Sequence, residues 1–285
     1  MIRPSRPNDA SALQHLWQIA FGDPPSAIEA FFSHLYQPGD AIVWAEGETV
    51  ASAIYLLDAG HLPQPGGKPL RASYAYALAT LPDYRGRGLG AAVTKAAIQR
   101  SAALGYDCNL ICPAEAGLFA YYTRLGYETA FPIAEGTLSC PPHSEPGIIC
   151  QVMSTCFSIY FRLRQDYLPL SALAYPEPFL RYMAFRCETS GGGLYRLEVE
   201  GRTGCAAVER RGGQLFVPEI LPAALAAPGI RALLSHLDAA CANFRTLPDM
   251  TPPVSLMHQR PFVLVSKTGT VSSLDGKGYV PFVLN

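Results

Sequence analysis

Apolar residues recur at helical spacing in two segments near the N-terminus, separated by the break Gly-Asp-Pro-Pro at 22–25. Side chains three or four positions apart lie on one face of a helix, so each segment predicts an amphipathic helix. The apolar positions are Leu13, Leu16, Trp17 and Ala20 in the first segment, and Ile28, Phe31, Phe32 and Leu35 in the second. The Pro-Gly-Asp turn at 38–40 ends the second predicted helix.

Strand-like and helix-like patterns follow one another from there to residue 131. Residues 41–45 and 50–57 are apolar runs joined by Glu-Gly-Glu, which predicts a β-hairpin. Later apolar runs predict strands at 74–81, 107–112 and 127–131, and helical spacing predicts helices at 88–104 and 118–125. This order predicts an α/β fold whose sheet is antiparallel at one side and parallel around residues 85–90.

One segment in the second half of the chain is similar in sequence to a segment in the first half. Glu-Gly-Glu-Thr-Val-Ala-Ser-Ala at 46–53 is matched by Glu-Gly-Arg-Thr-Gly-Cys-Ala-Ala at 200–207. Internal repetition is one interpretation, and coincidence between two hairpin turns is the other. The Pro-rich segment 140–147 is typical of a linker. We therefore expect a first domain at 1–140, a linker at 141–150 and a second domain at 151–285.

Composition narrows the function classes. With 285 residues, 49% hydrophobic content and a net charge of -1, the chain resembles neither a nucleic-acid-binding protein nor a membrane-surface protein. No run approaches the ~18 apolar residues of a membrane span, and the N-terminus lacks a signal-peptide core, so a soluble cytoplasmic protein is expected. The eight cysteines include no CxxC pair and the histidines are scattered, so we expect no metal site.

The stretch Arg-Gly-Arg-Gly-Leu-Gly-Ala at 85–91 lies between a predicted strand and a predicted helix. Glycine-rich backbone at a helix N-terminus presents N–H groups and the positive end of the helix dipole, which suits a phosphate group. A dinucleotide fingerprint formally fits Gly86-x-Gly88-x-x-Ala91, but 81–85 intervene after the strand and Asp107 precedes its own strand. A P-loop is excluded, because the chain has no Gly-Lys-Ser or Gly-Lys-Thr. Acyl-CoA is the third interpretation.

Two motifs support that interpretation. Arg85-x-x-Gly88-x-Gly90 has the form R/Q-x-x-G-x-G/A, and Ala-Tyr-Tyr-Thr-Arg-Leu-Gly-Tyr at 120–127 places a tyrosine four residues before a Gly-aromatic pair. With both motifs, residues 1–131 resemble the GCN5-related N-acetyltransferase (GNAT) superfamily. The tandem layout resembles its enhanced-intracellular-survival branch, without that branch's sterol-carrier-like domain. The resemblance implies a GNAT fold, a mixed, splayed sheet flanked by helices, followed by a degenerate GNAT-like copy that lacks the pyrophosphate loop.

The resemblance also implies site residues for acetyl-CoA as co-substrate, with no metal. It assigns the pantetheine arm to the strand end and the pyrophosphate to the loop, with Arg85 at the signature position. The cofactor-binding residues are Leu78, Ala79, Thr80, Arg85, Gly86, Arg87, Gly88, Leu89, Gly90 and Ala91. Leu78 would donate its N–H to the acetyl carbonyl, and Tyr122 would protonate the departing thiolate. Glu115 stands where the family often has Asn, and we expect it to begin a helix.

The implied reaction is direct transfer of acetyl from acetyl-CoA to a primary amine of a small molecule or peptide in a ternary complex. The alternative is a non-catalytic acyl-CoA-binding sensor. The sequence does not identify a general base that would deprotonate the amine. We therefore hypothesise that the C-terminal carboxylate of Asn285 approaches Tyr122. The sequence does not distinguish an aminoglycoside, a polyamine, an amino acid or a protein lysine as acceptor, and a homo-oligomer is compatible with it.

Overall fold

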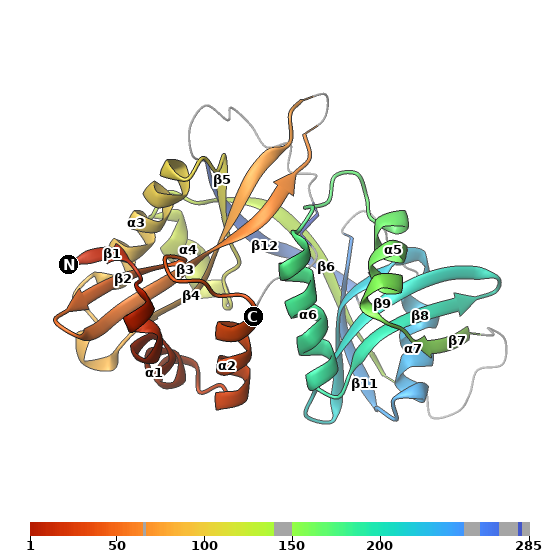
Figure 1. Cartoon of the computed structure of the whole chain (residues 1–285). Coiled ribbons are helices and arrows are strands. Elements are labelled where there is room, and N and C mark those ends of the chain that lie inside the picture. The colour runs from red at the N-terminus through yellow and green to blue at the C-terminus, as the bar shows by residue number, and fades with distance from the viewer. Residues whose placement is uncertain (65–66, 140–149, 248–256, 268–278, 281–285) are drawn as a thin grey trace.

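The computed structural model describes residues 1–64, 67–139, 150–247, 257–267 and 279–280. In these residues a single sheet of 12 strands runs through both halves of the chain, in the order β1-β2-β3-β4-β5-β12-β6-β11-β10-β9-β8-β7. Helices lie on both sides of it, and the two halves stand side by side along the sheet (Figure 1). The predicted α/β class is therefore confirmed.

The first half follows the predicted order, with one short strand, β1, that was not predicted before the first helix. β1 pairs antiparallel with β2, β2 with β3 and β3 with β4, whereas β4 and β5 are parallel. Its strands are β1 (Ile2–Pro4), β2 (Ala41–Glu46), β3 (Thr49–Leu62), β4 (Leu70–Thr80), β5 (Cys108–Ile111) and β6 (Glu128–Ser139). Its helices are α1 (Ala10–Phe21), α2 (Pro25–His34), α3 (Leu89–Ala103) and α4 (Ala116–Thr123).

The second half repeats this order as far as its parallel pair. The two matching sequence segments both form hairpins, closed by the pairs Glu46–Thr49 and Val199–Arg202. Its strands are β7 (Cys150–Ser154), β8 (Gly193–Val199), β9 (Arg202–Arg211), β10 (Gln214–Leu221), β11 (Cys241–Thr246) and β12 (Met257–Lys267). Its helices are α5 (Phe157–Tyr167), α6 (Glu177–Thr189) and α7 (Ala226–His236). β10 and β11 are parallel, as β4 and β5 are.

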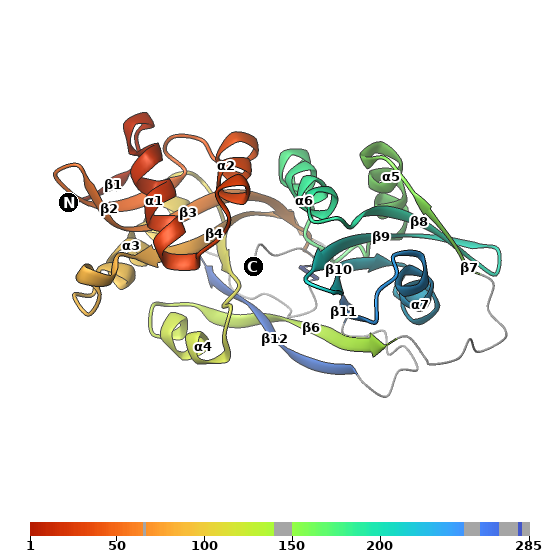
Figure 2. The ribbon, with the colours of Figure 1, turned by 90° about the horizontal axis from the view of Figure 1, so that it is seen from below.

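Strand β12 joins the two halves. It lies between β5 and β6 and is antiparallel to both, with Leu264 opposite Ile111 and Arg260 opposite Ile133. β6 in turn pairs with β11 of the second half. Figure 2 shows β6 and β12 running side by side from one half toward the other. The division into 1–140 and 151–285 stays a prediction, but a strand from beyond residue 151 completes the sheet of the first half.

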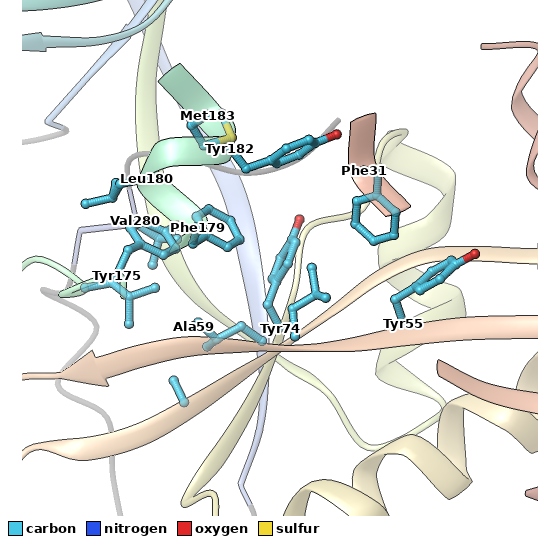
Figure 3. Close-up of a cluster of buried hydrophobic side chains, with 14 of the residues drawn as sticks. Phe31, Tyr55, Ala59, Tyr74, Tyr175, Phe179, Leu180, Tyr182, Met183 and Val280 are labelled. Atoms are coloured by element: carbon cyan, nitrogen blue, oxygen red, sulfur yellow. The ribbon is translucent and has the colours of Figure 1, made fainter. Parts of the chain in front are cut away.

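Aromatic side chains from both halves share one core on the side of the sheet that α1, α2, α5 and α6 cover, drawn in Figure 3. The rings of Phe31 on α2 and Tyr182 on α6 lie 5.9 Å apart, and those of Tyr74 and Phe179 lie 6.4 Å apart. Such pairs contribute about 0.5–1.5 kcal/mol each beyond the area they bury. This shared core fixes α6 of the second half against the helices of the first.

No helix in the described part of the chain is both long and apolar enough to cross a membrane. The predicted linker 141–150 lies almost wholly outside the described residues.

Candidate active site

A β-bulge in β4 forms one side of the candidate site. The β3–β4 register runs from Ala53 opposite Ala79 to Tyr55 opposite Tyr76, so β4 has one extra residue there. The extra residue is accommodated at Ala77, whose φ of +49° is a left-handed conformation that is uncommon outside glycine. Pairing between β4 and β5 covers only Ala72–Ala75. Past this point the two parallel strands are no longer paired, and the bulged end of β4 faces a cavity.

This cavity has a volume of about 340 Å³. Its walls come from the end of α1, the α1–α2 loop, the bulged part of β4, the end of β5 and α4. Leu78 and Tyr122, the two described residues for which the sequence predicts a catalytic role, both line it. They are 44 positions apart in sequence, so their meeting in one cavity is a result of the fold.

Burial holds Tyr122 in its protonated form. Its side chain is buried on α4, and this burial raises its pKa above the ordinary value, with a smaller contribution from neighbouring Tyr121. The ring packs against Tyr127, with 5.9 Å between centroids. Tyr127 donates a hydrogen bond to Asn109, whose side-chain amide donates to Ser73 Oγ at 2.8 Å. These buried hydrogen bonds fix Tyr127, against which Tyr122 packs, to Asn109 on β5 and Ser73 on β4.

The predicted phosphate loop adopts a conformation that requires glycine. Gly86 and Gly88 have φ of +76° and +75°, and Gly88 is the N-cap of α3. The side chain of Leu89 is buried and anchors the start of the helix, while Gly90 sits in its first turn. A Cβ at Gly90 would lie 3.3 Å from the hydroxyl oxygen of Tyr121. The loop therefore presents bare backbone at the N-terminus of a 15-residue helix.

The two arginines of the loop have different partners. Arg85 is exposed and its Nε donates to the carbonyl oxygen of Thr80 at 3.2 Å, which ties the loop to the end of β4. Arg87 pairs with Glu46 at 3.0 Å, and both side chains are about half exposed, so this pair contributes about 1 kcal/mol or less. The carbonyl of Ala79 accepts a bond from Ser52 Oγ at 2.8 Å. In the strand end predicted to bind pantetheine, the backbone carbonyls of Ala79 and Thr80 thus accept hydrogen bonds from side chains of this chain.

Asp23 is the site residue that sequence reasoning missed. It lies in the α1–α2 loop and carries the one carboxylate among the described residues that line the cavity. The indole N–H of Trp17 donates to its Oδ2 at 2.8 Å, which fixes the carboxylate on the cavity wall. In the sequence, Gly-Asp-Pro-Pro carries only the signal of a helix break. Nothing local in the sequence reveals that this break meets Tyr122.

Glu115, a further residue that the sequence analysis considers, is not among the residues that line the cavity. Glu115 is the exposed N-cap residue of α4, which agrees with the expectation that it begins a helix. Asn285 falls outside the described residues, so the hypothesis that its carboxylate approaches Tyr122 stays a prediction. Ala91 occupies the first turn of α3 beside Gly90.

The second half has a matching bulge but not a matching site. The β9–β10 register shifts between Phe216 and Glu219, as the β3–β4 register shifts between Tyr76 and Ala79. The position that corresponds to Leu78 is therefore Pro218, which has no backbone N–H to donate.

The surroundings of this second bulge are also unlike a cofactor site. Glu219 is fully buried, pairs with Arg164 at 2.8 Å and accepts a bond from the Tyr160 hydroxyl at 2.6 Å. α7 follows with Ala-Ala-Pro-Gly in its first turn instead of the basic glycine loop. The bulge persists in the second half, whereas a backbone N–H at the position of Leu78 and the basic glycine loop do not.

The first half of the chain matches a known domain family. Residues 1–130 match the family model described as the acetyltransferase (GNAT) domain. Among solved structures, a conserved protein from Enterococcus faecalis V583 named as a probable N-acyltransferase has a TM-score of 0.69 at 14% identity, covering 94% of this chain and 72% of that one. A search of curated proteins finds no match.

Two further solved structures show a similar fold over nearly the whole chain. Eis1 from Mycobacterium abscessus has a TM-score of 0.64 at 16% identity, covering 94% of this chain and 74% of that one. A tandem GNAT protein from the clavulanic acid biosynthesis pathway has a TM-score of 0.58 at 15% identity, with coverage of 95% and 99%. The fold is thus an α/β fold that these solved structures share over nearly the whole chain. Residues 1–130 match the acetyltransferase (GNAT) domain, and the chain as a whole is similar in fold to Eis1 and to the tandem GNAT protein.

Proposed function

We propose that the chain is an N-acetyltransferase that moves acetyl from acetyl-CoA to a primary amine by direct attack in a ternary complex. The observation that carries the proposal is the meeting of Leu78 and Tyr122 in one cavity beside the glycine loop. Backbone N–H groups at a β-bulge, a buried phenol and a helix N-terminus are three features that acyl transfer from a phosphate-bearing donor can use.

The loop suits the pyrophosphate of acetyl-CoA. Gly86, Gly88 and Gly90 leave the backbone accessible, and the α3 dipole favours negative charge there. When bound, the thioester supplies an activated acetyl group. The backbone N–H of Leu78 would stabilise the negative charge that develops on the acyl oxygen, an interaction worth about 3 kcal/mol in comparable sites. The protonated phenol of Tyr122 would supply the proton for the thiolate that leaves.

Asp23 completes the site on the amine side. Its carboxylate, held by Trp17, lines the same cavity as Leu78 and can pair with an entering ammonium group. An ammonium must lose a proton before it attacks, and this carboxylate or a water beside it can accept one. None of these proposed steps involves a metal ion.

The alternative is a non-catalytic acyl-CoA sensor, which would use the same loop without transfer. Two measurements separate these functions. Thermal stabilisation by acetyl-CoA but not by NAD would support the acyl-CoA site, and equal stabilisation by both would contradict it. Release of free thiol that depends on an added amine would support the enzyme. Stabilisation by acetyl-CoA without amine-dependent release under any condition would favour the sensor.

A further inference from the structure

The amine side of the cavity combines one carboxylate with aromatic walls. Trp17 lies 5.5 Å from Tyr76 and 5.8 Å from Phe21 between ring centroids, and all three line the cavity around Asp23. Leu118 of α4 adds an aliphatic contact. Aromatic faces attract a cation as well as apolar groups, and Asp23 is the one carboxylate for an ion pair among the described residues that line the cavity.

The charges beyond Asp23 are arranged to repel a second cation. Arg186 of α6 is the charged group that acts most strongly on cavity-lining Tyr76, where it opposes the rise in pKa that burial causes. It also opposes the rise of the Tyr182 pKa to about 12, which burial causes. Arg186 lies one helical turn after Tyr182 on α6, and the ring of Phe31 lies 5.9 Å from Tyr182 and 5.7 Å from Tyr76, so this part of α6 packs beside the aromatic residues of the cavity. Asp23 acts on the pKa of both tyrosines as well.

Glu209 does not offer a free second carboxylate. Arg186 lies 3.5 Å from it and Arg211 lies 2.8 Å from it, so two guanidinium groups share one carboxylate. Its side chain is also largely buried, with 5% of its surface exposed. A ligand ammonium reaching past Asp23 toward the second half would therefore meet net positive charge, and like charges at such range in a partly buried site repel.

We propose that the acceptor is a monocationic primary amine with an apolar body, of the arylalkylamine or alkylamine class. The ammonium group pairs with Asp23, the apolar body lies against Trp17, Phe21 and Tyr76, and Arg186 excludes polycations such as polyamines and aminoglycosides. This inference rests on the proposed function, because it concerns the acceptor side of the same cavity.

The experiment is a comparison of acceptors with the full chain. Thiol release from acetyl-CoA is measured with 2-phenylethylamine, hexylamine, spermidine and kanamycin, and acetyl-CoA binding is measured separately by calorimetry. We expect kcat/KM for 2-phenylethylamine to exceed that for spermidine and for kanamycin by at least 10-fold. A higher value for either polycation would overturn the acceptor class while leaving acetyl transfer in place.

If acetyl-CoA binds but no amine is acetylated, the proposed function fails. The acceptor class is then decided by calorimetric binding of 2-phenylethylamine and spermidine to the acetyl-CoA complex. Tighter binding of 2-phenylethylamine supports the inference, and equal or weaker binding overturns it.

Two variants test the charge argument independently. Asp23→Asn should lower kcat/KM for 2-phenylethylamine at least 10-fold, while Glu48→Gln, an exposed acid in the β2–β3 turn, serves as the matched control. Arg186→Gln removes the repelling guanidinium and leaves Glu209 paired with Arg211. It should raise the kcat/KM of spermidine relative to 2-phenylethylamine by at least 3-fold, and an unchanged ratio would overturn the role assigned to Arg186. Circular dichroism melting confirms that each variant is folded.

Discussion

Tyr122→Phe isolates a single hydroxyl in the proposed mechanism. The ring lies buried on α4 between Tyr121 and Tyr127, with centroid distances of 5.0 and 5.9 Å, and these contacts survive the change. The unfolding free energy should therefore change by about 1 kcal/mol or less. A general acid typically contributes ~10²–10⁴-fold, so kcat should fall by at least about 100-fold, or ~2.7 kcal/mol. The acetyl-CoA dissociation constant should stay within about threefold, since the loop is untouched.

The assay is thiol release at saturating acetyl-CoA and amine, with single-turnover measurements to confirm that transfer limits the rate. Tyr121→Phe is the matched control, because Tyr121 is the preceding residue on α4, is not among the residues that line the cavity and hydrogen-bonds Thr94. Since burial raises the Tyr122 pKa above its ordinary ~10, ionisation of this phenol should cause no loss of activity below about pH 10. Wild-type kcat in Tyr122→Phe under transfer-limited conditions would refute the assignment.

Three further substitutions test the loop, the fold and the electrostatics. Gly88→Ala places a Cβ at φ +75° and should weaken acetyl-CoA binding at least 10-fold by calorimetry, whereas Gly105→Ala, at φ +77°, costs similar strain of ~1 kcal/mol without affecting binding. Gly60→Ala would make its Cβ collide with a backbone carbonyl oxygen of the second half, so its unfolding free energy should fall by ~2 kcal/mol or more, clearly beyond that of Gly105→Ala. Asp9→Asn should cost ~1–2 kcal/mol at pH 7, since Arg3 donates to this carboxylate at 2.6 and 2.9 Å. The hydrogen bond from Arg3 holds the pKa of Asp9 below its ordinary value, so this difference should persist down to about pH 4 and shrink as the pH falls further; a difference that does not depend on pH would contradict the assignment.

Local signals in the sequence were sufficient for most helices, the hairpins and the phosphate loop. Apolar spacing identifies α1, α2 and α3, because helices bury one face at a period of 3.6 residues. The glycine-rich sequence of the loop predicts the conformation at Gly86 and Gly88, because glycine is the residue that most readily adopts a left-handed backbone. Tyr122 was found only through its motif, since a tyrosine on an apolar helix face has no local mark of function.

The features that were not predicted depend on long-range packing. The bulge at Ala77 involves no glycine or proline, so the sequence gives no sign of its positive φ. β12 lies between β5 and β6 although more than 100 residues of chain separate it from either, and strand order of that kind is not encoded in local periodicity. Asp23 resembles an ordinary turn residue until the fold brings it to the cavity of Tyr122.

Acetyl transfer itself is the central claim, and the balance of products tests it most directly. Acetyl-CoA labelled in its acetyl group is mixed with the full chain and 2-phenylethylamine, and free CoA and labelled N-acetyl amine are counted by mass spectrometry. We predict that the two products appear in equal amounts and that Tyr122→Phe slows both together. Release of CoA without acetylated amine, or binding of acetyl-CoA with neither product for any amine in the panel, would contradict the account.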